Sequence, residues 1–235
     1  MVKASEADMM IRVEERDLNL SGTGQIAGGA YRFVKLEGIS KVNGPMACEQ
    51  MTVNGVATMN GSVAADRFEL AGKLTVHGDL LIQAAKAEGQ ITIDGDFRGE
   101  AVSLNGMVKV KGNCELHEAA LAGGFTILGS LLASRVDLKL SGRCQAKSIQ
   151  AGMIEIRQLQ ESNWSKGLRF LIPALDPRAW VGQLIGEHIL IEATQAQLVR
   201  GDRISIGKGC VIDRVEYRAS LFIDPEAKVR ERVKI

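Results

Sequence analysis

Hydrophobic and polar positions alternate along most of the chain, and from Val34 to Leu138 the alternation recurs with a 17-residue period, without insertion or deletion. Two columns of glycine mark the repeat, at Gly38, Gly55, Gly72, Gly89, Gly106 and Gly123, and at Gly44, Gly61, Gly78, Gly95, Gly112 and Gly129. Repetition with a fixed period indicates a stacked-repeat protein, in which each unit buries its apolar side chains against its neighbours.

Each unit contains three short pieces in which every second residue is apolar. In the unit that begins at Gly72 these are Leu74 and Val76, Leu80 and Ile82, and Ala85 and Ala87. A step of two is the period of a β-strand, and glycine or small polar residues between the pieces suit corners. The pattern therefore predicts an all-β fold, a three-sided parallel β-helix with 17-residue coils. The two glycine columns alternate at a short separation, as from Gly38 to Gly44, and a longer one, as from Gly44 to Gly55. A left-handed hexapeptide repeat would be evenly spaced, so the pattern favours the right-handed form.

The repeat divides the chain into four expected parts. Residues 1–19 read as a charged tail, 20–156 as the main β-helix block, 157–185 as a non-repeat excursion, and 186–235 as further coils of the same period. Two proline residues in the excursion argue against one long helix there.

The repeat weakens towards the end of the main block and resumes near the C-terminus. Leu140 and Ala146 stand where the two columns predict glycine. In the C-terminal part the 17-residue period predicts stacking of Ile204 on Leu221, Ile206 on Ile223, Cys210 on Ala227, Ile212 on Val229 and Leu198 on Val215.

Charge and aromatic content narrow the expected partners. With 29 Lys and Arg against 28 Asp and Glu, the chain lacks the basic excess typical of nucleic-acid binding, and 4% aromatic residues leave little for stacking on bases. We expect no nucleic-acid partner. The N-terminal sequence has no signal-peptide pattern, and no run of about 18 apolar residues occurs, so we expect a cytoplasmic protein.

Residues that commonly carry catalysis or bind metals do not form a recognisable motif. The four cysteines (Cys48, Cys114, Cys144 and Cys210) lack zinc-site spacing, so we expect buried, reduced thiols and no metal. The three histidines (His77, His117 and His188) share no column, and Asp94 and Asp96 around Gly95 read as turn residues. The glycine-rich SGTGQIAGG segment is not followed by the Lys and Ser or Thr of a phosphate loop. We expect no catalytic residue, no cofactor and no small-molecule substrate.

The units also resemble a known family. LAGKLTVHG (70–78), AEGQITIDG (87–95) and LNGMVKVKG (104–112) are similar to the units of bactofilins, bacterial cytoskeletal proteins that form polymers. The segments NLSGTGQIAGGAYRFVKLEG (19–38) and RGDRISIGKGCVIDRVEY (200–217) resemble two-part members from spore-forming Gram-positive bacteria.

This resemblance covers about 20–156 and 186–229. It implies a right-handed triangular β-helix that assembles end to end without nucleotide, near the cytoplasmic membrane. The interruption at 157–185 departs from the single-part members, whose helix is continuous.

A scaffold function follows from the predicted architecture. The terminal coils of a solenoid expose apolar side chains and unpaired strand edges, and docking one rod on another would cover both. We expect self-association through the end coils, with Val34 and Leu36 on the first coil and Leu221, Ile223 and Val229 on the last. The expected role is a non-catalytic homopolymer that organises envelope-associated processes such as cell shape or wall synthesis.

Two other functions remain open at this stage. Parallel β-helices also include polysaccharide lyases and acyltransferases, so an enzyme is one alternative. The other is a monomeric adaptor that contacts the inner face of the cell membrane or envelope proteins through aromatic and basic residues of the excursion, namely Trp164, Lys166, Arg169, Phe170 and Trp180. The same residues could instead cover the solenoid.

Overall fold

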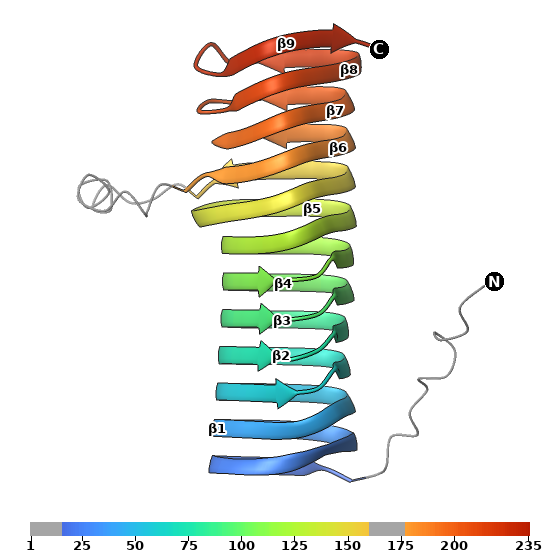
Figure 1. Ribbon diagram of the computed structural model, residues 1–235, viewed down its shortest axis with the longest axis vertical. Helices are drawn as coiled ribbons and strands as arrows, with labels where there is room; N and C mark the ends of the chain where they lie inside the picture. Colours follow the sequence, from blue (N-terminus) through green and yellow to red (C-terminus); the bar gives the residue numbers. More distant parts are fainter. Residues whose placement is uncertain (1–15, 160–176) are drawn as a thin grey trace, which may run out of the picture.

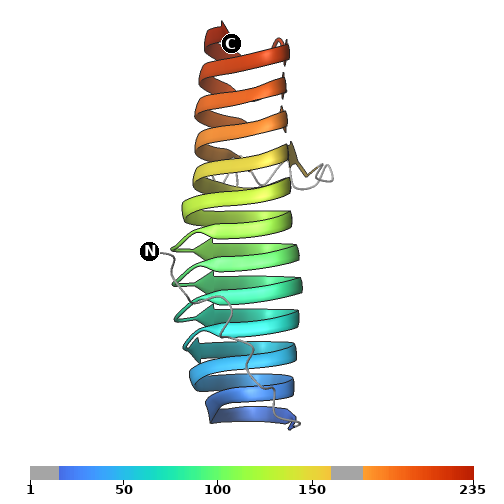
Figure 2. The same cartoon turned by 90° about the vertical axis from the view of Figure 1, so that its right-hand side faces the viewer.

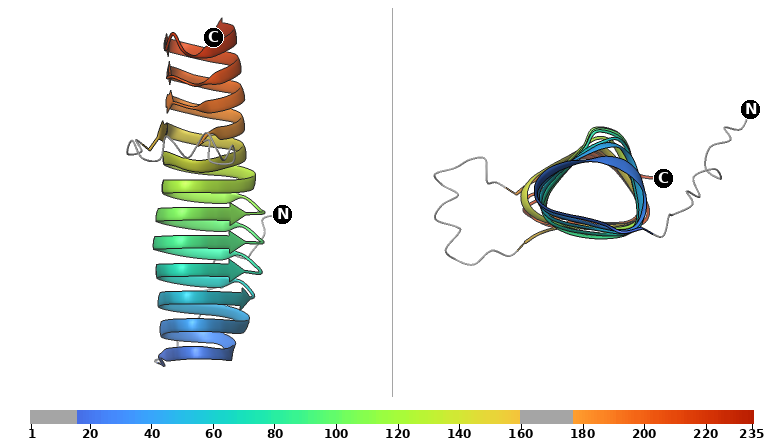
Figure 3. Two further views of the ribbon diagram at one scale, coloured as in Figure 1. Left: turned by 90° about the vertical axis from the view of Figure 1, so that its left-hand side faces the viewer. Right: turned by 90° about the horizontal axis from the view of Figure 1, so that it is seen from below.

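The computed structural model describes residues 16–159 and 177–235. All the regular structure in these two ranges is β-strand, wound into a single solenoid of about 10 turns (Figure 1). Seen along its axis the solenoid is three-sided, and its coils stack in one column from the N-terminal to the C-terminal end (Figures 2 and 3). The predicted parallel β-helix is confirmed.

Nine strands form one parallel sheet in which each strand pairs with the next along the chain. The strands β1 and β5 are long because the backbone stays extended around corners. The bounds are β1 (Leu18–Asn60), β2 (Val63–Val76), β3 (Leu80–Ile93), β4 (Phe97–Val110), β5 (Cys114–Gln158), β6 (Ala179–Ile191), β7 (Thr194–Ile206), β8 (Val211–Ile223) and β9 (Lys228–Lys234).

The register follows the 17-residue period from the pairing of β1 with β2 to the pairing of β4 with β5. Met51 pairs with Phe68, and Phe68 pairs with Ala85. The first glycine column stacks on itself, and its backbone has φ values from +97° at Gly38 to +136° at Gly72. Residues other than glycine rarely adopt such positive φ values, which explains why this corner carries glycine in each coil of the column.

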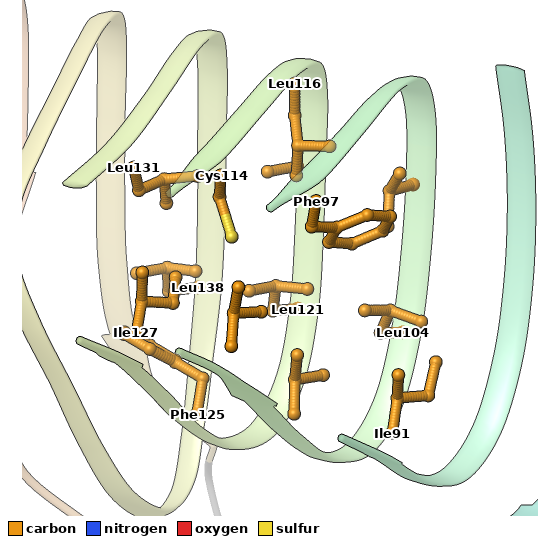
Figure 4. Close-up of a cluster of buried hydrophobic side chains, with 14 of the residues drawn as sticks. Ile91, Phe97, Leu104, Cys114, Leu116, Leu121, Phe125, Ile127, Leu131 and Leu138 are labelled. Carbon is orange, nitrogen blue, oxygen red and sulfur yellow. The ribbon is translucent and has the colours of Figure 1, made fainter. Parts of the chain in front are cut away.

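The interior is filled by aliphatic and a few aromatic side chains. Ile91, Phe97, Leu104 and Leu121 point into the space between the three walls (Figure 4). One continuous cluster of buried side chains extends from Tyr31 to Val215. Burying each large apolar side chain stabilises the fold by about 1.5–3 kcal/mol. The continuous cluster therefore joins the stacked coils into one core.

One extra residue disrupts the 17-residue period in the middle of β5. A Cβ atom on Gly142 would lie 3.7 Å from the Cα of Gly124, and the hydroxyl of Ser148 donates to that of Ser130, so the offset here is 18. Leu140 therefore does not replace a corner glycine. It lies in the core with 1% of its surface exposed, and Gly142 stacks near the glycines of the preceding coil.

The coils after β5 keep the predicted 17-residue period only in part: Ile206 pairs with Ile223 and Ile212 pairs with Val229, as predicted, but other pairs have shorter offsets. Ala179 pairs with Thr194, and Gln195 pairs with Val211, so the offset falls to 15 and then rises to 16. The predicted stacking of Leu198 on Val215 is wrong, because Leu198 pairs with Arg214. Shorter corners account for the difference, and one of them includes Ala193 at a φ of 46°. The 17-residue offset returns at Ile204 and Leu221, after a register shift in β7.

The solenoid resumes earlier than the sequence predicts. Cys144 of β5 pairs with Ala179 of β6, so residues 179–185 belong to a coil and not to the excursion. At the other side β5 continues to Gln158. The strands on the two sides of the gap between residues 159 and 177, β5 and β6, pair directly with each other, so the sheet is continuous there.

Candidate functional site

The N-terminal end surface consists of different residues from those predicted. Val34 and Leu36 are only 2% and 1% exposed, because the glycine-rich segment before them forms a coil of its own. In that coil the carbonyl of Arg16 accepts a hydrogen bond from the amide of Arg32 at 3.0 Å. The first described coil instead presents partly buried apolar side chains at Leu18, Leu20 and Ile26.

At the C-terminal end the predicted residues do lie on the last coils. Leu221, Ile223 and Val229 are partly buried and pack against the end of the core. The final strand, β9, pairs with residues 211–217 of β8, and Ser220–Ile223 pair only with β7 among the described strands. Phe222 points outward from this segment and is 60% exposed.

Of the five predicted excursion residues, the structure describes one. Trp164, Lys166, Arg169 and Phe170 lie outside the described residues. Trp180 is in β6, half-buried on the outer face of the sheet, where it pairs with Gln145 in β5 and Gln195 in β7. It is therefore part of the solenoid wall.

A hollow of about 290 Å³ opens beside Trp180. The guanidinium of Arg143 lies over the indole ring, 4.9 Å from its centroid. The lining residues come from consecutive coils and combine one aromatic ring with carboxamides and a carboxylate: Gln145, Trp180, Gly182, Gln195, Gln197 and Asp213.

Asp94 belongs to a column of polar side chains that project from another corner. Its carboxylate oxygens lie 2.7 Å from His77 Nδ1 and 2.8 Å from Lys111 Nζ, one coil away on either side. Hydrogen bonds from Lys111 and then His77 lower the pKa of Asp94 below its ordinary value of 3.8. An exposed carboxylate held ionised between two such partners is suited to joining coils.

Asp96 has a separate role from Asp94. Its Oδ1 accepts a hydrogen bond from the amide of Asn113 at 2.9 Å, and its own amide donates to Asp79 Oδ1 at 2.8 Å. The same contact recurs one coil away on each side: the amide of Asp79 donates to the hydroxyl of Ser62, and the amide of Ser130 donates to Asn113 Oδ1. Asp94 and Asp96 thus engage in two different columns of hydrogen bonds at the corner.

The three histidines lie on three different coils. His117 Nδ1 is 2.9 Å from the hydroxyl of Ser134, and His188 borders a shallow depression with Arg203, Ser205 and Phe222. In the two described ranges no three His, Cys, Asp or Glu side chains come together in a way that could hold a metal ion.

The cysteines are buried, as expected. Loss of solvent raises the pKa of the Cys48 and Cys114 thiols to about 12 and that of Cys144 and Cys210 to about 11. Since the thiolate is the reactive form, these side chains behave as small apolar groups.

An ion-pair chain across the last strands was missed at the sequence level. The Glu216 carboxylate, only 8% exposed, binds the guanidinium groups of Arg200 and Arg214, and Arg214 also contacts Glu231 at 3.0 Å. The two arginines, Arg200 first, lower the pKa of Glu216. A 16-residue offset aligns Arg200 with Glu216, so a 17-residue template could not find this pair, whereas Arg214 and Glu231 pair at the 17-residue spacing.

Comparison with known proteins gives two partial relatives. The chain is 34% identical over 110 residues to the uncharacterized protein YhbE of Bacillus subtilis, a match that covers 46% of this chain and 44% of the relative. It is 36% identical over 50 residues to the uncharacterized protein YhbF of the same organism, covering 21% of each. The matches therefore span less than half of either relative.

No family model and no solved structure matches the chain. The described residues contain no helix that is long and apolar enough to cross a membrane.

Proposed function

We propose that this protein is a non-catalytic scaffold that associates with itself, without nucleotide, through its terminal coils. The observation that carries the proposal is the state of the core at its two ends. In the middle coils the inward-facing apolar side chains of the core are buried, whereas Leu18, Leu20, Leu221, Ile223 and Val229 at the ends are only partly buried.

The strand edges support the same conclusion. Backbone groups of an edge strand without a partner can pair with another chain, and because each interior strand pairs with both of its neighbours, the free edges of this sheet lie at its terminal coils. Docking a second copy would extend the sheet and bury the half-exposed core residues together. The resemblance of the repeat units to bactofilins adds to this argument.

The proposed setting is the cytoplasm, at the inner face of the cell membrane, where a polymer would organise cell shape or wall synthesis. Its partners would be further copies of the chain and proteins of the envelope.

Sedimentation velocity and electron microscopy of the purified protein test the proposal. Ile223→Arg should reduce the assembled fraction, because a charge in a water-excluded contact is unfavourable. Leu20→Arg tests the opposite end. Ser220→Arg is the matched control, since Ser220 lies on the same strand but is exposed, and it should assemble like wild type.

Thermal unfolding of each variant separates loss of docking from loss of fold. If wild type sediments as a monomer at all concentrations, or if both end variants assemble normally, self-association through the terminal coils is wrong.

A further inference from the structure

We infer that the hollow beside Trp180 is a binding site for an uncharged saccharide. The site lies on the outer face of the solenoid wall and uses outward side chains, whereas the proposed self-association uses the partly buried core side chains of the end coils, so the two proposals can be tested separately.

The register brings the site together from four strands. Gln145, Trp180, Gln195 and Val211 occupy the same outward position in consecutive coils. Two residues further along the strands β6, β7 and β8 stand Gly182, Gln197 and Asp213. A ligand lying on this wall would therefore meet side chains from β5 to β8, spaced by about 4.8 Å per coil.

Gly182 is one of the residues that line the hollow. A Cβ atom at this position would lie 2.5 Å from the carbonyl oxygen of Lys147, so a side chain is not tolerated without movement of the backbone. With no side chain at Gly182, nothing projects from this position into the hollow that it lines. At about 290 Å³ the space is near the lower end of the range for ligand pockets, about 300–1,000 Å³, and suits one sugar ring.

The lining groups match hydroxyl-rich, neutral ligands. A carboxamide offers both donors and an acceptor, so Gln145, Gln195 and Gln197 can each pair with hydroxyl groups in either sense. Asp213 adds an acceptor. The indole of Trp180 gives an apolar surface with a polar edge, which fits a sugar ring whose C–H face is apolar. Arg143 over the ring restricts its rotation and preorganises this surface.

The side chains of the site argue against an anionic ligand and against a membrane surface. The residues that line the hollow include Asp213 and no Lys or Arg, and the neighbouring guanidinium of Arg143 lies over the indole of Trp180, whereas a phosphate or carboxylate ligand is commonly held by free cationic groups. A membrane surface would have to bury the three carboxamides and Asp213 together with Trp180, and burying polar groups without partners is costly.

Isothermal titration of the full chain with β-1,4-linked tetrasaccharides of glucose and of N-acetylglucosamine tests the site. We expect saturable binding of at least one, weakened about tenfold in Trp180→Ala and in Gln197→Ala. Gln183→Ala is the control, because Gln183 is exposed on the same strand but does not line the hollow, and it should bind like wild type. Circular dichroism melting verifies that each variant is folded; Gln197 is exposed, so its variant still tests the site if Trp180→Ala does not fold.

Absence of saturable binding up to about 10 mM of both sugars overturns the inference. So does equal affinity in wild type and Gln197→Ala. Flotation with phosphatidylglycerol vesicles serves as a second arm, and vesicle binding that is lost in Trp180→Ala, without any sugar binding, would assign this face to a membrane.

Discussion

Gly72 and Gly89 stack in register at the same corner of consecutive coils, and a Cβ atom on Gly89 would come within 2.0 Å of the carbonyl oxygen of Gly72. Gly89 also has a φ of +128°. Two independent constraints, backbone conformation and lack of space, therefore act on one residue. The same pair of constraints recurs at Gly55, Gly106 and Gly123.

Replacing this glycine should be strongly destabilising. We expect Gly89→Ala to lower the free energy of unfolding by about 2–4 kcal/mol, the sum of an unfavourable φ and overpacking against backbone. Gly44→Ala is the control, since Gly44 has a φ of +101° but no atom nearer than 3.9 Å, and it should cost about 1–2 kcal/mol. Urea unfolding followed by circular dichroism gives both values. Equal losses would show that the close approach is unimportant.

The corner hydrogen bonds give a second prediction. Asp96→Ala removes the acceptor for the amide of Asn113 and should cost about 1 kcal/mol. Asp96→Asn keeps an acceptor oxygen, as Asn113 itself does for Ser130, and should unfold close to wild type. A similar loss in both variants would assign the effect to the charge of Asp96 and not to its hydrogen bond.

The Asp94 column predicts a pH dependence. Because contacts with Lys111 and His77 lower the pKa of Asp94 in the folded state, the carboxylate stabilises the fold above its ordinary value of 3.8, and this stabilisation is lost as the pH falls through the lowered pKa. Asp94→Ala should therefore have a lower Tm than wild type at neutral pH. The two curves should converge well below pH 3.8.

The measurement is the Tm by circular dichroism across this pH range. Glu88→Ala serves as the control for removal of an exposed carboxylate, on β3, which ends directly before Asp94, and it should leave the Tm nearly unchanged. A wild-type advantage over Asp94→Ala that persists unchanged at the acid end contradicts the assignment.

Burial of the thiols predicts slow chemical modification. With the pKa of Cys114 raised to about 12 and that of Cys210 to about 11, very little thiolate exists at neutral pH. Iodoacetamide should modify the four cysteines of the folded protein far more slowly than those of the protein in guanidinium chloride, as followed by mass spectrometry. Rapid labelling of a cysteine in the folded state would show that its coil opens readily.

The sequence determined the repeating part of the fold. Each coil needs glycine at its corner with positive φ and an apolar residue at every second position of its strands. Because these requirements are local, they recur at a fixed spacing in the sequence and can be recognised there. For the same reason the coil-end residues Leu221, Ile223 and Val229 were placed correctly, whereas Val34 and Leu36 were not. The coil that covers Val34 and Leu36 is rich in glycine, and it has too few apolar residues for the repeat pattern to be recognised in the sequence.

Only the tertiary structure decided where the period changes and what those changes bring together. The extra residue before Gly142, the 15-residue step to Thr194 and the 16-residue step to Val211 depend on how corners pack on the coil below. These offsets align Arg200 with Glu216, and Trp180 with Gln145 and Gln195. A fixed template cannot align such residues, because contacts between coils are set by three-dimensional stacking and not by spacing along the chain.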